Sequence, residues 1–374
     1  MMKITVGRDP FLAELNILQG VVERKNTIPI LSRLALEAVA SNRIRIKATD
    51  LDVGIETECD AQVEGQGITV VPAKKLFDIV RSLPNGEILL EQTADKGAHW
   101  LRLRCAGSNF NIAGDAAEHF PTMPALPQTP PVVISAALLH SFISHTSFAI
   151  TLEESRYALS GALIVLAGGE MEMVTTDGHR LAHARHQVDA SRNLRVIVPK
   201  KALVELQKLL PALVKQDSNA TVGMYNNDNH LFFQTGKRLL SSRVLAGQFP
   251  NYESVIPKGN PNEVVLNTAD IASALRRSCI MAEDRTHGVL FDLSENTVLL
   301  EAKSPESGEV TEQLAGTYKG ESCRVRFNGL YMLDFLAVVG TEQVTLAIKD
   351  DTSPALLAPV GSNGFSCTVM PLRL

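Results

Sequence analysis

VVPAKKLFDIV, residues 70–80, recurs in outline as IVPKKALVEL, residues 197–206, so that Pro72 and Pro199 lie 127 positions apart. A weaker third copy, VRFNGLYMLDFL, occupies residues 325–336. In each copy a strand-like run leads into apolar residues at helical spacing, and the two prolines suit a first helical position. The chain is therefore predicted to repeat one supersecondary unit.

Two further landmarks keep the same order and spacing. Thr49-Asp50 recurs 127 positions later as Thr176-Asp177, and Phe120-Pro121 recurs 129 positions later as Phe249-Pro250. A third copy of the first landmark would fall in LLEAKS, residues 299–304, which lacks the Thr-Asp pair. The alternative is that unrelated β-α-β segments share one kind of helix start. We favour three similar domains, at residues 1–127, 128–257 and 258–374.

Each repeat is predicted to hold two helices and about eight short strands. The first helices are expected at residues 11–22, 136–149 and 269–282, and the second helices follow the repeated strand-like runs. Hairpin turns are expected at Ser41-Asn42, Gly168-Gly169 and Ser294–Asn296. Because this spacing does not suit parallel βαβ winding, the predicted fold class is α+β with antiparallel sheets.

The charge is acidic overall but basic on particular helices. The 374 residues carry 36 Lys and Arg against 41 Asp and Glu, and aromatic residues make up only 5%. This disfavours a groove-reading DNA module, which is usually strongly basic, and a single-strand platform, which needs aromatic side chains. Residues 72–83 and 199–210 each carry a net charge of +2 and residues 268–282 carry +1, whereas Asp334 is the only charge on the third repeat's second helix.

Lysines and arginines on helix faces attract duplex phosphates without reading sequence, which would permit sliding. Ordinary solvated helix faces are the alternative.

The remaining composition predicts a reduced, cytoplasmic protein. The five cysteines are scattered and include no CxxC pair, so neither disulfides nor a zinc site is expected. No cofactor or metal is predicted. The longest apolar run, residues 162–167, is far shorter than the roughly 20 residues that cross a bilayer. We expect a chain that is neither secreted nor membrane-bound.

Catalytic motifs are absent, with no phosphate-binding loop, GxSxG or HExxH. The cluster nearest to one is TDGHRL, residues 176–181, where Asp177 and His179 could serve acid–base chemistry. However, Asp50 occupies the same repeat position and no histidine or arginine follows it at the equivalent spacing. Repeat position therefore explains the aspartate, and we do not expect an enzyme.

These residues resemble the bacterial DNA polymerase III beta subunit family, the DNA sliding clamps. The matches are TDGHRL, the two VPxK helix starts, FPxY at 249–252, FNxxY at 327–331 and VMPLRL at 369–374. The resemblance implies the DNA clamp fold, with three similar domains per subunit. It also implies a head-to-tail homodimer that closes into a ring, with helices lining the hole.

The implied function is mechanical. A ring around double-stranded DNA would hold on by topology, without sequence specificity, and would tether the replicative DNA polymerase for processivity. The family's other partners are the clamp loader, repair polymerases and mismatch-repair proteins, and no membrane is involved. These proteins use a short peptide that enters an apolar groove between the second and third domains.

The resemblance also places the groove on this chain. The apolar side chains would form its socket, and His179, Arg180 and Asn328 would orient the peptide. Ordinary core is the alternative for three of them, Leu159, Leu181 and Val255. The matching positions are Leu159, Thr176, Gly178, His179, Arg180, Leu181, Pro250, Val255, Asn328, Tyr331, Val369, Met370, Pro371, Leu372 and Arg373.

This chain departs from the family pattern at Ser254, Pro354 and Thr368, where arginine, serine and valine are familiar. These departures leave the preferred peptide open.

Two further sites follow the resemblance. Ile280 and Met281 match subunit-interface positions that face a strand carrying Phe110 on the partner. Positions near DNA are Lys25 and the loop at 153–157, with Arg156 and Tyr157. Helical charge adds Lys74, Lys75, Lys200, Lys201 and Arg277 to the DNA-binding set.

Two rival interpretations stay open. One is an enzyme that uses Asp177 and His179. The other is a three-domain scaffold that binds proteins without encircling DNA.

Overall fold

The structure, a computed structural model, describes residues 1–23, 28–39, 42–93, 99–189, 192–306, 308–362 and 364–373. Lys25, Ser41 and Leu374 lie outside the described residues. The chain divides into two compact units, and this division cuts through the second repeat. The first unit is Met1–Ala137 with Lys201–Val244, and the second is Leu138–Lys200 with Leu245–Leu374.

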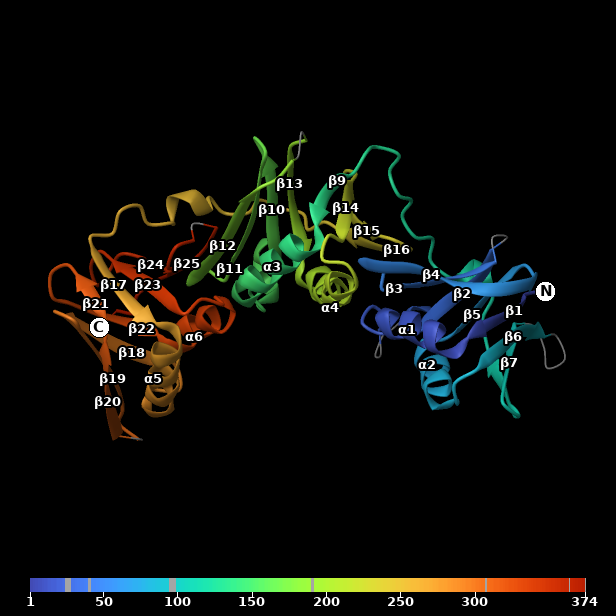
Figure 1. The fold of residues 1–374 in the computed structure, drawn as a ribbon, viewed down its shortest axis with the longest axis horizontal. Coiled ribbons are helices and arrows are strands. Elements are labelled where there is room, and N and C mark those ends of the chain that lie inside the picture. Colours follow the sequence, from blue (N-terminus) through green and yellow to red (C-terminus); the bar gives the residue numbers. More distant parts are fainter. Residues whose placement is uncertain are drawn as a thin grey trace. The chain divides into compact units, whose positions relative to one another are not determined.

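The first unit is built on one 12-stranded antiparallel sheet (Figure 1). Its main path runs β8-β7-β6-β1-β4-β16-β15-β14-β9, and β5, β2 and β3 join it through β4. Its helices are α1 (Arg8–Leu18), α2 (Ala73–Ser82) and nearly all of α4 (Lys200–Gln216). Its strands are β1 Lys3–Gly7, β2 Arg33–Val39, β3 Arg43–Thr49, β4 Val53–Gly65, β5 Gly67–Pro72, β6 Glu87–Thr93, β7 Trp100–Cys105, β8 Ser108–Ala113, β9 Val132–Ser135, β14 Thr221–Asn226, β15 His230–Thr235 and β16 Arg238–Arg243.

The second unit contains two antiparallel sheets (Figure 1). One runs β13-β10-β11-β12-β25-β24-β23-β17-β21 and the other β20-β19-β18-β22. Its helices are most of α3 (Ala136–Thr146), α5 (Thr268–Met281) and α6 (Gly329–Val338). Its strands are β10 Gly161–Ala167, β11 Glu170–Thr176, β12 Arg180–Gln187, β13 Leu194–Pro199, β17 Asn262–Asn267, β18 Gly288–Ser294, β19 Thr297–Ser304, β20 Gly308–Ala315, β21 Thr317–Lys319, β22 Cys323–Asn328, β23 Gln343–Ile348, β24 Ala355–Pro359 and β25 Phe365–Val369.

Strand order shows the threefold repeat directly. One set of four strands recurs as β5-β2-β3-β4, β13-β10-β11-β12 and β22-β18-β19-β20. The other recurs as β8-β7-β6-β1, β16-β15-β14-β9 and β25-β24-β23-β17. With two α-helices per repeat among the described residues, the predicted α+β class, antiparallel sheets and three similar domains are confirmed.

The repeated prolines end strands rather than begin helices. Pro72 is the last residue of β5 and the N-cap of α2, and Pro199 ends β13 directly before α4. The helix start predicted at each proline is therefore one residue early. In the third repeat Asn328 takes this place, and its side-chain Oδ1 accepts hydrogen bonds from the backbone N–H groups of Leu330 (3.0 Å) and Tyr331 (3.3 Å). This is a common N-cap arrangement for asparagine.

Buried aromatic residues fill the core of the third repeat. Phe291, Phe327 and Phe335 have no exposed surface, and the first two pack edge to face with ring centroids 5.5 Å apart. Helices α5 and α6 contact each other beside this core. The apolar periodicity that predicted these helices is therefore the pattern of their buried faces.

We predict that two cysteines resist thiol reagents in the native protein. Cys59 and Cys367 are buried, and burial raises the pKa of each thiol to about 12. Since the thiolate is the reactive form, neither residue should react with iodoacetamide at pH 8 until the chain unfolds. Peptide mass spectrometry checks this by comparing the labelling of each cysteine in buffer with its labelling in enough guanidinium chloride to unfold the chain. Equal labelling of Cys367 under both conditions would contradict its burial in the native protein.

Candidate functional site

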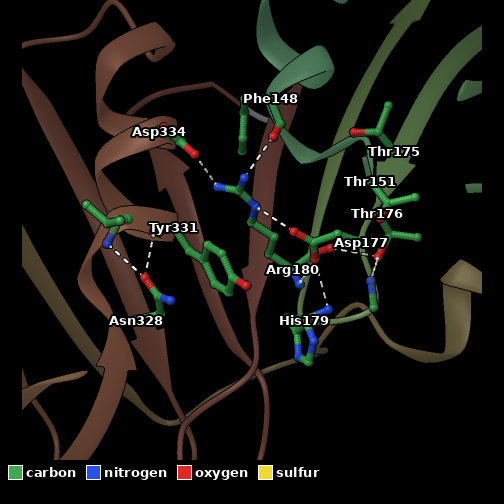
Figure 2. A network of polar contacts seen from close by, with 12 residues as sticks. Phe148, Thr151, Thr175, Thr176, Asp177, His179, Arg180, Asn328, Tyr331 and Asp334 are labelled. Atoms are coloured by element: carbon green, nitrogen blue, oxygen red, sulfur yellow. Dashed lines mark hydrogen bonds and ion pairs between the residues drawn. The ribbon is translucent and has the colours of Figure 1, made fainter. Parts of the chain in front are cut away.

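The TDGHRL segment forms a tight turn between β11 and β12 (Figure 2). The Thr176 hydroxyl donates to the Arg180 carbonyl (2.6 Å) and accepts from the Gly178 N–H (3.1 Å). The Asp177 carboxylate accepts from the backbone N–H groups of His179 (2.9 Å) and Arg180 (3.0 Å). Gly178 has φ +89°, and a Cβ there would lie 2.7 Å from Nη1 of Arg156. Glycine adopts this positive φ without strain, and a side chain here would have to displace the Arg156 guanidinium.

The first repeat makes the same turn without histidine or arginine. The Thr49 hydroxyl donates to the Val53 carbonyl (3.1 Å), and the Asp50 carboxylate accepts from the backbone N–H groups of Asp52 (2.9 Å) and Val53 (2.7 Å). Asp50 and Asp177 therefore do the same structural work. This favours the repeat explanation of Asp177 over the enzyme interpretation.

Arg180 is the centre of the site. Its side chain is 9% exposed, and each guanidinium nitrogen donates a hydrogen bond. Nε binds Asp177 Oδ2 (3.1 Å), Nη1 binds Asp334 Oδ2 (2.6 Å), and Nη2 binds the Phe148 carbonyl (2.8 Å), as Figure 2 shows. Arg180 thus joins β12 of the second repeat to α6 of the third repeat.

Two aromatic rings make cation–π contacts with this guanidinium. The Arg180 Cζ atom lies 4.5 Å from the ring centroid of Tyr331 and 5.2 Å from that of Phe148. The His179 ring stacks in turn beside Tyr331, with centroids 6.3 Å apart and an interplanar angle of 22°. Burial and the nearby Asp177 carboxylate raise the pKa of Tyr331, so its phenol keeps its proton at neutral pH. Because the cation–π contact with Arg180 favours this position of the Tyr331 ring, Arg180 also positions the surface on which His179 stacks.

Predicted groove residues fall into three groups by exposure. Thr176, Arg180, Leu181 and Val369 are buried, and the Asn328 oxygen caps α6. The exposed group, which we call the candidate partner surface, comprises Gly178, His179, Pro250, Val255, Met370 and Arg373. The half-buried positions are Leu159, Tyr331, Pro371 and Leu372.

Backbone contacts hold the C-terminal segment against this surface. The Met370 N–H donates to the His179 carbonyl (2.9 Å), and the Leu372 N–H donates to the Arg326 carbonyl (2.7 Å). The structure therefore brings the TDGHRL turn and the VMPLRL segment together, although they are far apart in sequence.

An apolar cluster underlies the segment that carries Pro250 and Val255. It consists of the buried residues Leu163, Val174, Leu181, Ile197, Phe249 and Tyr252. Tyr252 is 3% exposed, and its hydroxyl donates to Glu172 Oε2 (3.0 Å). Beside it lies a cavity of about 400 Å³ lined in part by Glu172, His183 and Ile256. The sequence analysis assigned none of Glu172, His183 and Tyr252 to a site, although Tyr252 lies in the FPxY match. It also did not predict that Phe148 and Asp334 contact Arg180.

The predicted subunit-interface residues lie at two sheet edges. Phe110 lies on β8, the terminal strand of the first unit's sheet. Ile280 is 74% exposed near the end of α5, and α5 packs against β20, the terminal strand of the four-stranded sheet.

The predicted DNA-binding residues differ in how their charge is used. Lys74 and Lys75 are exposed at the start of α2, and neither they nor Lys200 form an ion pair with a described residue. In contrast, Lys201 pairs with Asp50, and Arg277 makes two 2.6 Å hydrogen bonds to the carboxylate of Glu312.

The loop residues also differ. Tyr157 is 57% exposed, whereas Arg156 pairs with Glu153 (3.0 Å) and donates to the Asp177 carbonyl (2.6 Å). Arg156 therefore supports the TDGHRL turn from the neighbouring loop.

Two classes of site find no support in the described part of the chain. It contains no group of three or more His, Cys, Asp or Glu side chains arranged to hold a metal ion. Its helices are all too short or too polar to span a membrane.

Fold and site together define a protein of three repeated α+β domains with a candidate partner surface where the second and third repeats meet. Family models agree with this division. The DNA polymerase III beta subunit N-terminal domain matches residues 2–124, the central domain 133–251 and the C-terminal domain 253–373. The chain belongs to the DNA polymerase III beta subunit family.

Individual relatives match along their whole length. A beta sliding clamp from Pseudomonas aeruginosa is 34% identical, with 100% of both chains covered. The crystal structure of the DNA polymerase III subunit beta from the same species has a TM-score of 0.93 at 32% identity, again over 100% of both chains. A Pseudomonas aeruginosa sliding clamp bound to griselimycin has a TM-score of 0.91 at 32% identity and the same coverage.

Proposed function

We propose that this chain is a DNA sliding clamp, in which two copies close head to tail into a ring around duplex DNA. The ring tethers the replicative polymerase and is not itself an enzyme. The proposal is supported by the way one repeat joins the next, because the strands equivalent to the joining pair, β8 of the first repeat and β20 of the third, lie at the ends of their sheets among the described strands. The domain boundaries after residues 127 and 257 are part of the proposal.

Each junction between repeats uses one kind of strand pair. The last strand of the second repeat, β16, pairs antiparallel with β4 of the first, and β25 of the third repeat pairs antiparallel with β12 of the second. The counterpart strands β8 and β20 end their sheets, and no described strand pairs with their outer edges. If β8 of one copy pairs with β20 of another, the same junction forms a third time. Two such contacts close a head-to-tail ring, because each copy offers both edges.

Phe110, Ile280 and Met281 support this contact. Phe110 is on β8 itself, and a Cβ at Gly308 of β20 would lie 3.4 Å from Cε of Met281. The neighbouring Ile280 is largely exposed, so its apolar side chain is available for contact with a second copy. Phe110 on β8 and Met281 beside β20 thus lie at the two strands of the proposed contact.

The solution mass, combined with an electron-microscopy image, tests the ring. We predict a dimer at micromolar concentration, with six similar lobes around an opening that admits duplex DNA. A monomer at that concentration, or a compact dimer without an opening, would instead favour the scaffold interpretation.

Salt dependence separates the basic residues that can meet phosphate from those already paired. We predict that the triple variant Lys74→Ala, Lys75→Ala, Lys200→Ala lowers the slope of log affinity against log salt by up to about 3 on short duplex DNA. The matched control is Lys201→Ala with Arg277→Ala, whose charges Asp50 and Glu312 already offset. Fluorescence anisotropy between about 50 and 200 mM salt measures both slopes. A control that changes the slope as much per residue as the triple variant would refute this assignment.

The candidate partner surface is proposed to take a short peptide from polymerase, clamp loader, repair polymerases and mismatch-repair proteins. Apolar Val255, Met370 and Pro250 supply contact area, and His179 supplies a polar group for orientation. We also propose that griselimycin, which the Pseudomonas clamp binds, occupies this surface here. A cytoplasmic location remains a prediction that accompanies this function.

A further inference from the structure

We propose that Glu172, His183 and Tyr252 form a latch that positions Pro250 and Val255 for partner binding. These three are positioning residues, since none belongs to the exposed candidate partner surface. The inference rests on the proposed function of that surface, and its test separates the two.

The latch converges on one carboxylate oxygen. The Tyr252 hydroxyl donates to Glu172 Oε2 (3.0 Å), and His183 Nε2 lies 2.7 Å from the same oxygen. Because a carboxylate only accepts, His183 donates from Nε2. The hydrogen bond from His183 lowers the pKa of Glu172, so both contacts are charge-assisted at neutral pH.

Backbone hydrogen bonds connect the buried Tyr252 to the exposed Val255. The N–H groups of Val255 (3.0 Å) and Ile256 (3.3 Å) both donate to the Tyr252 carbonyl, within the single helical turn at Tyr252–Ser254. The position of the 39% exposed Val255 side chain therefore follows that of the buried Tyr252 ring.

Pro250 lies two residues before Tyr252, next to the buried Phe249. The buried side chains of Phe249 and Tyr252 thus fix the part of the candidate partner surface that Pro250 contributes.

The equivalent segment of the first repeat lacks the three residues of the latch. Strand register and the Phe-Pro landmark place Arg45, Glu56 and Met123 at the positions of Glu172, His183 and Tyr252. Arg45 forms ion pairs with Glu56 (3.2 Å) and Glu58 (2.9 Å), and Met123 has no hydroxyl to donate. The latch thus occurs in the repeat that carries the candidate partner surface and is missing from the first.

Water can replace the hydrogen bonds of the latch once one of them is lost. The Glu172 side chain is 23% exposed, and it lines the 400 Å³ cavity together with His183, Tyr252 and Ile256. Loss of one hydrogen bond to a charged group therefore favours local opening of the segment without unfolding the sheet.

The test compares Tyr252→Phe and Glu172→Ala with Arg45→Met, the matched change in the first repeat. Hydrogen exchange at residues 253–256 reports opening of the segment, griselimycin affinity reports the surface, and the melting temperature reports global stability. We expect exchange to be about tenfold faster in Tyr252→Phe and faster still in Glu172→Ala. Griselimycin should bind several-fold more weakly to Glu172→Ala, since fewer molecules have the segment closed. Arg45→Met should leave both readouts unchanged.

Three results would overturn the proposal. Unchanged exchange at residues 253–256 in both latch variants would show that the hydrogen bonds do not hold the segment. Faster exchange with unchanged griselimycin affinity, while Val255→Asp abolishes binding, would remove the positioning role but keep the surface. Normal binding by Val255→Asp would show that the surface itself is misassigned, and the latch would then have nothing to position.

Discussion

Replacing Arg180 with alanine should lower the free energy of unfolding of the second unit by about 3 kcal/mol. The change leaves Asp177, whose side chain is 16% exposed, without its cation, and removes both cation–π contacts with Phe148 and Tyr331. The estimate lies at the low end for a broken buried ion pair because the Asp334 side chain is 49% exposed and water can solvate it. Urea unfolding monitored by circular dichroism measures the difference.

The same variant should also lose griselimycin binding, because Tyr331 and His179 no longer have a fixed partner. Arg180→Lys keeps a charge but not the planar fork, so it should fall between the wild type and Arg180→Ala. Arg243→Ala removes an exposed arginine from β16 and should change stability by less than about 0.5 kcal/mol. Unfolding of Arg180→Ala at the wild-type urea concentration would show that this arginine does not join the repeats.

Repetition made the fold predictable. VVPAKK and IVPKKA are equivalent strand-to-helix junctions, so a pattern weak in one copy gained support from the next. The structure confirms two helices and antiparallel strands in every repeat. Local detail was less accurate: α4 runs through Pro211 to Gln216, beyond the predicted end at residue 210, because apolar spacing does not define where a helix stops.

The partners of Arg180 could not be predicted, because they depend on contacts over long sequence distances. Asp334 is 154 residues from Arg180, and Phe148 contributes a backbone carbonyl that any residue has. One signal was available: Asp334 is the only charge on a helix that is otherwise apolar, which suggests a specific ionic partner.

Helical charge gave a similarly incomplete answer for DNA binding. Net charge per helix treated Lys75 and Lys201 alike, yet Lys201 pairs with a buried carboxylate contributed by Asp50. Asp50 belongs to the turn of the first repeat, so only the folded chain shows that this lysine is already neutralised.

Topological retention on DNA is the central claim, and we expect a large effect from cutting the DNA. After loading by a clamp loader onto nicked circular plasmid, the protein should stay bound at a salt concentration that removes direct phosphate contacts. A ring cannot leave a closed circle without opening, whereas it can slide off an end. Contact binding would be insensitive to ends, since the phosphates are the same in both forms.

The most direct measurement is therefore the fraction of loaded protein that co-elutes with the plasmid on gel filtration before and after cleavage at a single restriction site. We predict retention on the nicked circle and loss within minutes of linearisation. Equal retention on circular and linear DNA would contradict it.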